Sequence, residues 1–220
     1  MITTLLYSLF ALDQTLQELA AQHPWVMFAA LFIVIFAETG LVIFPLLPGD
    51  SLLFLAGTVT AVSGLNVHLL VLTLFVAAVL GDSVNYGIGR YIGPKAFHRP
   101  QDTWLGRWLK PKYLQQTHRF YEKYGGFTII IGRFVPVVRT FAPFLAGVGA
   151  MTYRKFLSYN VIGAALWVAS LAYAGYLFGN IPWVKDNLIW IVLGIVIVSV
   201  MPAAIQFGRE RRARRDAGRP

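Results

Sequence analysis

Residues 129–149 read IIIGRFVPVVRTFAPFLAGVG, an apolar stretch that carries two arginines and two prolines. A second stretch, residues 44–57, reads FPLLPGDSLLFLAG and is equally apolar, but it carries Asp50 in place of arginine. Both end on Phe-Leu-Ala-Gly, at 54–57 and at 144–147. We expect each stretch to enter a bilayer, break at its Pro/Gly/polar tip and restart as a half-helix. The rest of the chain is then expected to hold the two face to face.

The composition indicates a membrane protein. Of the 220 residues, 57% are hydrophobic and only 13% are charged, whereas a soluble domain carries about 25% charged residues. The sequence contains no cysteine, which excludes disulfides, thiol chemistry and Cys-ligated metal. A formal charge of +9 could suggest nucleic acid as a partner. Because the positive residues lie where cytoplasmic loops are expected, we predict no nucleic-acid binding.

Four stretches are long and apolar enough to cross a bilayer, which takes about 20 residues. These predicted spans are residues 25–44, 67–88, 156–178 and 181–205. Residues 1–22 carry leucines on one face but are too polar to span, which predicts an amphipathic helix along the cytoplasmic interface. A signal peptide is disfavoured because neither a basic start nor a cleavage site is present.

Charge predicts the topology, because Lys and Arg near span ends resist translocation. The basic loop at 94–126, Arg154-Lys155 and the Arg-rich tail at 207–220 should all be cytoplasmic, with both termini inside. The broken stretches 45–63 and 127–149 then enter from opposite faces of the bilayer. The predicted fold is a single all-α polytopic membrane domain with four full transmembrane helices, two oppositely oriented re-entrant segments and interfacial amphipathic helices.

An internal repeat agrees with this topology. The two Phe-Leu-Ala-Gly copies are 90 residues apart, and a looser echo, Gly89–Gly93 against Gly175–Gly179, is 86 residues apart. With opposite topology, these echoes predict an inverted repeat of residues 25–93 and 127–206, the architecture of many secondary transporters. In such proteins broken helices place their ends near the membrane midplane, where the substrate binds.

Charged side chains at bilayer depth cost about 2.5–3.5 kcal/mol each even on lenient insertion scales, so they are functional by default. Five residues of this kind are Glu38, Asp50, Asp82, Arg133 and Arg139. One alternative is that Glu38 and Asp50 simply neutralise the two arginines and lock the halves together. Against it, buried ion pairs are seldom more stabilising than apolar packing.

The local sequence favours a binding site. Asp50 or Ser51 is expected to cap a half-helix that begins at Leu52, and Thr140 to cap a second one with Pro143 in its first turn. Both half-helices would begin inside the membrane. A helix N-terminus offers free N–H donors and a positive dipole end, which suit an anion.

We therefore predict a phosphate site at Arg133, Arg139 and Thr140, because the planar guanidinium can hold two phosphate oxygens at once. Glu38 and Asp50, in a dry environment, are expected to take up and release protons. Asp82 and Ser51 are additional candidates. Asp82 also shares one helix face with Asn85 and Tyr86, so a packing network is an equally good interpretation of it.

Nothing in the sequence indicates catalysis, a cofactor or a metal site. The histidines, at positions 23, 68, 98 and 118, lie at span ends or in the loop without metal-ligand spacing. An intramembrane lipid phosphatase would need a histidine at depth. We therefore expect a protein that is not an enzyme.

Several motifs resemble the DedA family of bacterial inner-membrane proteins, part of the VTT (SNARE-associated-like) superfamily. The motifs are Glu38-Thr-Gly40, Phe44-Pro-Leu-Leu-Pro-Gly-Asp-Ser51, Gly81-Asp-Ser-Val-Asn-Tyr86 with Gly89-Arg90, Phe120-Tyr-Glu-Lys-Tyr-Gly-Gly126, Arg133-Phe-Val-Pro-Val-Val-Arg-Thr-Phe-Ala-Pro143, Ala146-Gly147, Tyr153-Arg154 and Tyr159-Asn-Val-Ile-Gly163. They run over almost the whole chain, and the arginine-proline motif is highly specific.

The resemblance implies a multi-pass lipid transporter of the bacterial cytoplasmic membrane. Family members are implicated in returning undecaprenyl phosphate across that membrane in dependence on the proton gradient, and eukaryotic relatives behave as phospholipid scramblases. The family's functional acidic pair falls on Glu38 and Asp50, and its arginine pair on Arg133 and Arg139. The implied partners are an anionic lipid carrier and protons; a homodimer is left open.

Two other functions compete with lipid-phosphate translocation. A proton-coupled exporter of a small cation would use the two acids as its binding site. A scaffold of the division or envelope machinery would not require four charges at bilayer depth, although it could explain the loop at 94–126.

Overall fold

The computed structural model describes residues 15–41, 49–97, 125–179, 181–187, 190–191 and 194. This part of the chain contains helices and no strand, which confirms the predicted all-α class for it. In chain order, the helices are α2 (Pro24–Gly40), α3 (Gly49–Val62), α4 (Val67–Phe97), α7 (Phe127–Gly132), α8 (Pro136–Val148), α9 (Tyr153–Gly179) and α10 (Pro182–Asp186). Residues 15–22 are also helical.

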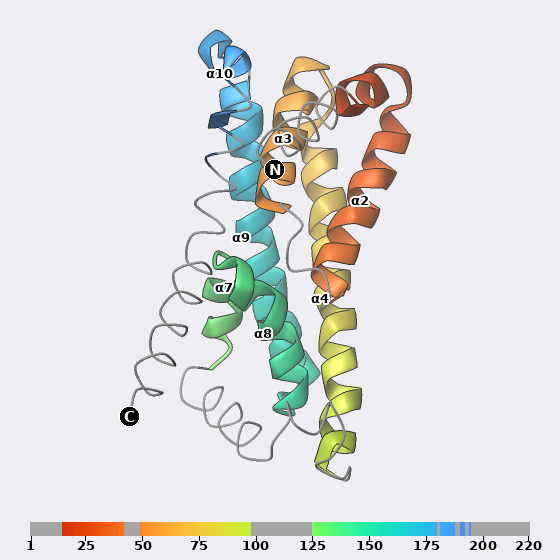
Figure 1. Cartoon of the computed structure of the whole chain (residues 1–220), viewed down its shortest axis with the longest axis vertical. Coiled ribbons are helices and arrows are strands. Elements are labelled where there is room, and N and C mark those ends of the chain that lie inside the picture. The colour runs from red at the N-terminus through yellow and green to blue at the C-terminus, as the bar shows by residue number, and fades with distance from the viewer. Residues whose placement is uncertain are drawn as a thin grey trace, which may run out of the picture.

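The long helices α4 and α9 run beside each other along the length of the molecule (Figure 1). Val67–Ile92 and Tyr153–Gly179 are long and apolar enough to cross a membrane, in agreement with the predicted spans 67–88 and 156–178. At about 1.5 Å per residue, each exceeds the roughly 30 Å of a hydrocarbon core. Large apolar side chains on their outer faces, among them Leu72 and Leu166, are exposed. Such an outer surface suits contact with lipid.

Helix α2 begins with Pro24 in its first turn and ends at Gly40, where Leu41 is extended with φ −105° and ψ 112°. Its 17 residues are fewer than the 20 predicted for the 25–44 span. The tip between α2 and α3, together with the predicted helix over 1–14, most of the loop at 94–126 and the tail at 207–220, lies outside the described residues. The same holds for most of the predicted span 181–205, of which α10 is the only complete helix described.

The second broken stretch forms two helices, α7 and α8, but its break is not where the sequence predicts it. Val135 is extended with φ −115° and ψ 109°, and Pro136 opens α8. Thr140 therefore lies inside α8 and is not its cap, and Pro143 lies in the helix interior. The physical reason is that a residue before proline favours the extended region, and proline is favoured at the first helical position.

Helix α3 also starts earlier than predicted. It begins at Gly49 instead of Leu52, so Asp50 and Ser51 lie in its first turn and do not cap a later one. Both side chains therefore belong to the helix itself. An acidic residue in this position is favourable because the free N–H groups give the helix start a positive character.

Two short helices pack against the two long ones in a reciprocal way. Helix α3 packs mainly on α9, and α8 mainly on α4; α3 lies in the upper half of Figure 1 and α8 in the lower half. A Cβ atom added to any of four glycines would collide with a backbone carbonyl of the partner helix. These close approaches are Gly57 to Ala172, Gly175 to Phe54, Gly147 to Tyr86, and Gly89 to Phe144.

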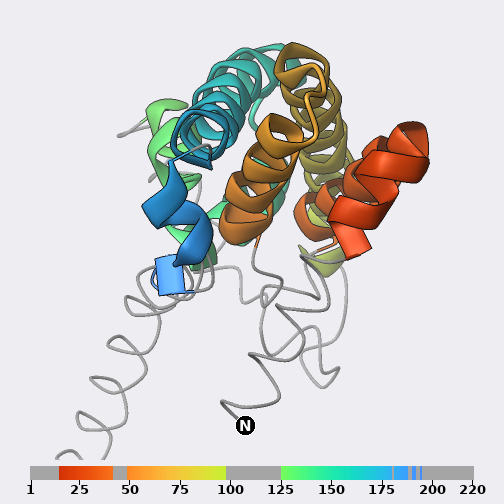
Figure 2. The ribbon, with the colours of Figure 1, turned by 90° about the horizontal axis from the view of Figure 1, so that it is seen from above.

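The first Phe-Leu-Ala-Gly copy, in α3, thus packs against α9, which carries Gly175. The second copy, in α8, packs against α4, which carries Gly89. Small residues let two helix backbones approach closely, which is how helices associate in membranes. Seen from above, α3 lies against α9 and α4, while α2 is on the far side of α4 (Figure 2). The largest fully buried side chain of the described core is Trp167 of α9, and it faces the polar residues described next.

Candidate functional site

The charged residues singled out by the sequence lie inside the protein and form two clusters. Four of them are almost fully buried: Glu38 and Arg133 are 3% exposed, Asp82 1% and Arg139 6%. Asp50 is partly buried, with 17% of its side chain exposed. Burial of this kind is tolerated only when charges are paired and hydrogen-bonded, and the pairing divides the five residues into two groups.

The Arg139 cluster consists of Arg139, Glu38 and Asp50. Arg139 Nη2 lies 2.5 Å from Glu38 Oε1, and Arg139 Nη1 lies 2.7 Å from Asp50 Oδ1. The three side chains come from α8, α2 and α3. The Gly49 N–H, at the start of α3, also donates to Glu38 Oε1 at 3.2 Å. One arginine therefore ties two short helices to α2.

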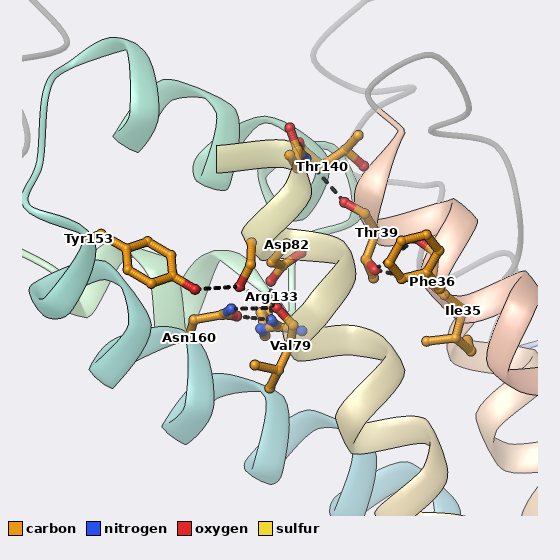
Figure 3. Close-up of polar contacts among 11 residues, drawn as sticks. Ile35, Phe36, Thr39, Val79, Asp82, Arg133, Thr140, Tyr153 and Asn160 are labelled. Carbon is orange, nitrogen blue, oxygen red and sulfur yellow. Dashed lines mark hydrogen bonds and ion pairs between the residues drawn. The ribbon is translucent and has the colours of Figure 1, made fainter. Parts of the chain in front are cut away.

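The Arg133 cluster consists of Arg133, Asp82 and Asn160, which meet between α4 and α9 (Figure 3). Arg133 Nη2 donates to the Asp82 carboxylate and to the Asn160 side-chain oxygen. Asn160 Nδ2 in turn donates to the Val79 carbonyl at 3.2 Å. Among the described residues, Arg133 Nε and Nη1 and Asp82 Oδ1 are buried without a hydrogen-bond partner. The second cluster thus keeps unused donors.

Trp167 connects the two clusters. Its ring centre lies 4.7 Å from the guanidinium carbon of Arg139 and 5.9 Å from that of Arg133, within the range of cation–π attraction. Its indole N–H donates to Asp50 Oδ1 at 2.8 Å. The sequence analysis missed this residue. The available signal was a tryptophan in the middle of an uncharged span, because a buried indole N–H needs an acceptor.

Asn85 holds α2 and α8 at fixed positions beside the clusters. Its Nδ2 donates to the Thr39 carbonyl at 3.1 Å and to the Thr140 carbonyl at 2.9 Å; Thr39 and Thr140 are labelled in Figure 3. Thr140 is buried and contributes its main chain to this contact. Ser51 is also buried, and its Oγ has no partner in the described part of the chain.

These contacts decide between the two interpretations of the Asp82 face. Asp82 belongs to an ion pair, whereas Asn85 and Tyr86 make packing contacts with main-chain carbonyls, the Tyr86 hydroxyl with that of Met151. Glu38 and Asp50 do pair with an arginine, as the internal-pairing alternative expected, but both pair with Arg139. Arg133 pairs with Asp82 instead. Whether the pairing is the whole role of these charges stays a prediction.

With all groups ionised, the Arg139 cluster carries one cation and two anions, and the Arg133 cluster carries one of each. The Arg139 cluster therefore has a net charge of −1 and becomes neutral when one of its carboxylates gains a proton. The Arg133 cluster can offer N–H groups to an anion without first releasing its own carboxylate. Within the described residues no three His, Asp or Glu side chains gather in a way that could hold a metal ion.

Apolar outer helix faces around paired, buried charges define an integral membrane protein. Residues 47–177 match the VTT domain family. The chain is 52% identical to Protein DedA of Escherichia coli K12 over 204 residues, covering 92% of this chain and 91% of DedA. It is 36% identical to the inner membrane protein YqjA of the same organism over 183 residues, covering 83% of this chain and 80% of YqjA.

An uncharacterized membrane protein of Mycobacterium tuberculosis H37Rv, Rv0364, is 46% identical over 189 residues, which are 85% of this chain and 81% of that protein. No solved structure matches the chain. The chain belongs to the DedA family of VTT-domain membrane proteins, as the motif resemblance predicted.

Proposed function

We propose that this protein is a transporter of the bacterial cytoplasmic membrane that translocates undecaprenyl phosphate, or a related phospholipid, with proton coupling. It acts without a cofactor and is not an enzyme. One observation carries the proposal: two buried arginines meet carboxylates from three other helices, and one of them keeps two unpartnered nitrogens. A protein that needed these charges only for packing would gain little from leaving donors unused.

The architecture that goes with this function has four full spans and two re-entrant segments that enter from opposite faces, with both termini cytoplasmic. The reciprocal glycine contacts of α3 with α9 and of α8 with α4 support an inverted repeat. The shortness of α3 and α8, 14 and 13 residues, supports helices that stop partway through the bilayer.

In the proposed mechanism, the phosphate headgroup enters between the clusters while its hydrocarbon tail stays in lipid. Arg133 Nε and Nη1 donate to phosphate oxygens, because arginine hydrogen bonds to phosphate are charge-assisted and geometrically selective. Arg139 and the first turn of α8 with Thr140 complete the phosphate site once Arg139 is released from its acids.

Proton binding supplies that release. When Glu38 or Asp50 takes up a proton, the Arg139 cluster loses its excess negative charge and one ion pair to Arg139 weakens. Arg139 can then share the phosphate charge. Loss of the proton restores the ion pair and expels the headgroup. Coupling arises because the carboxylates and the phosphate compete for the same arginine, so a proton on one carboxylate favours binding of the headgroup.

The test is movement of radiolabelled undecaprenyl phosphate in proteoliposomes containing wild type, Arg139→Ala or Arg139→Lys. We expect flux in the wild type, its loss at every pH in Arg139→Ala, and partial flux in Arg139→Lys, which keeps the charge but not the planar fork. Absence of wild-type flux under an imposed proton gradient would sink the lipid assignment and favour a scaffold.

A small-cation exporter is the second candidate, because Glu38 Oε2 is buried and lacks a hydrogen-bond partner among the described residues. Charge reversal separates the two functions. Arg139→Glu should abolish phosphate-lipid flux, whereas a cation exporter should retain or increase cation uptake by the same variant. Uptake of labelled cations into the same proteoliposomes is the measurement.

A further inference from the structure

A cavity of about 660 Å³ that is widely open to its surroundings lies between α4 and the start of α9, and none of the residues of the two charged clusters lines it. Its lining is formed by Ser83, Tyr86, Gly87, Arg90, Tyr91, Thr152 and Tyr153. Pockets that bind small molecules usually measure about 300–1,000 Å³. The lining residues carry one guanidinium, five hydroxyl groups and no carboxylate. The hydroxyls of Ser83 and Tyr86 already donate to the main-chain carbonyls of Val79 and Met151.

Gly87 is an exposed residue of α4 that borders this cavity. A glycine inside a helix costs about 1 kcal/mol relative to alanine, so it usually has a packing reason. Gly89, one glycine further along α4, has such a reason, because a Cβ there would collide with the Phe144 carbonyl. A Cβ on Gly87 would meet nothing within 4 Å. Close packing therefore does not explain Gly87, whereas an unfilled space beside the helix does.

The opposite end of the molecule shows the same place filled. The spacing of 86 residues that relates Gly89 to Gly175 relates Gly87 to Tyr173. The Tyr173 hydroxyl hydrogen-bonds His68 Nδ1 at 2.6 Å, and the two rings are 5.7 Å apart. At the Gly87 end the aromatic contact between α4 and α9 is made by Tyr86 and Tyr153 instead, with ring centres 5.6 Å apart, and position 87 itself carries no side chain.

The Gly87 end also carries a positive charge, because Arg90 lines the cavity. Tyr153 donates only a long hydrogen bond, 3.4 Å, to Ser83 Oγ, so its hydroxyl can turn to a ligand. Arginine with hydroxyl donors suits phosphate oxygens, and tyrosines suit the level of lipid headgroups.

We propose that this cavity is a second, peripheral site that binds the phosphate headgroup of an anionic glycerophospholipid from the adjacent leaflet. Arg90 pairs with the phosphate, and the hydroxyls of Thr152 and Tyr153 donate to its remaining oxygens. The site does not depend on lipid transport by the charged clusters.

The absence of cysteine from the chain allows a direct test with full-length protein in detergent. Gly87→Cys puts one thiol in the cavity, and Ser158→Cys puts one on an exposed position of α9 that does not line it. The rate of labelling by a polar maleimide is measured with dihexanoyl phosphatidic acid, dihexanoyl phosphatidylcholine or inorganic phosphate. We expect only phosphatidic acid to slow labelling at Gly87→Cys, and no probe to slow it at Ser158→Cys.

Arg90→Gln in the Gly87→Cys protein should weaken this protection about tenfold, the usual effect of losing a hydrogen bond to a charged group. Arg154→Gln, an exposed arginine that does not line the cavity, is the matched control and should leave protection unchanged. Direct titration of phosphatidic acid against Arg90→Gln and Arg154→Gln without the cysteine gives the same comparison if Gly87→Cys folds poorly.

Equal protection by phosphatidylcholine, or protection that survives Arg90→Gln, would overturn the site. Protection by inorganic phosphate at the same concentration would assign the cavity to the free ion and overturn the lipid assignment. Undecaprenyl phosphate flux, measured in parallel, reports separately on the transport proposal, so failure of one is distinguishable from failure of the other.

Discussion

The two buried arginines of this protein lie close to the same tryptophan ring, yet they are paired in different ways. Arg139 is held by two carboxylates, one from α2 and one from α3, and lies near the start of α8. Arg133 sits in the break before α8, is held by one carboxylate and one amide, and keeps two buried nitrogens without partners in the described chain.

The difference suggests that the two arginines have separate tasks. A cation between two anions is sensitive to protonation, because one proton removes the excess charge. A cation with one anion and unused N–H groups is ready to bind an anion. The following variants test whether the two arginines have separate tasks, beginning with the largest expected effect.

Arg139→Ala should be the most damaging change, because it leaves Glu38 and Asp50 buried without their cation. Removing one partner of a buried ion pair costs about 3–5 kcal/mol. Thermal unfolding of the detergent-solubilised protein measures this loss. Adding Glu38→Gln and Asp50→Asn to Arg139→Ala should recover part of it. An unchanged melting temperature for the single variant would contradict the pairing.

Arg133→Gln should destabilise the protein less, by about 2–3 kcal/mol, because it leaves one carboxylate and not two without a partner. The double variant Arg133→Gln with Asp82→Asn should be more stable than either single variant, since no unpaired charge remains. A double-mutant cycle on unfolding measures this coupling. If the coupling were with Glu38 instead of Asp82, the division into two clusters would be wrong.

Trp167→Phe keeps an aromatic ring beside both guanidinium groups but removes the N–H that Asp50 accepts. Losing a hydrogen bond to a charged group costs about 1.5–3 kcal/mol. Trp167→Leu should cost about 0.5–2 kcal/mol more, because the cation–π contacts are lost as well. We expect lipid flux to follow the same order. Equal effects of both variants would mean that the ring contributes nothing.

Asn160→Leu should have the smallest effect, about 1 kcal/mol, because Arg133 keeps its ion pair with Asp82 and loses only a neutral acceptor. Phosphate-lipid flux should fall moderately, and its dependence on the proton gradient should be the same as in the wild type. A changed gradient dependence would show that the Arg133 cluster takes part in proton exchange.

The sequence identified the buried charged residues, but it did not predict which of them form ion pairs. Charges at bilayer depth are costly wherever they occur, so Glu38, Asp50, Asp82, Arg133 and Arg139 could be recognised one at a time. Their ion-pair partners depend on how α2, α4 and α8 pack against one another, and this packing cannot be predicted from the local sequence around each charge. Asp82 was therefore assigned no partner.

Local rules were ambiguous where two residues satisfy the same rule. Pro136 and Pro143 can both begin a helix, and the sequence analysis chose the second, whereas α8 begins at the first. Trp167 and Asn160 were overlooked because neither is charged, and both lie in an apolar span where packing is the usual role. The repeated glycines Gly89 and Gly175 were informative although the sequence repeat is weak, because each lies against the main-chain carbonyl of a phenylalanine of the packed short helix.

The most direct test is undecaprenyl phosphate flux as a function of an imposed proton gradient, in proteoliposomes of wild type, the double variant Glu38→Gln with Asp50→Asn, and Arg133→Gln. We predict that the double variant still moves the lipid but no longer responds to the gradient, while Arg133→Gln moves little lipid at any gradient. Flux in the double variant that still follows the gradient, or wild-type flux in Arg133→Gln, would contradict the separate tasks assigned to the two arginines.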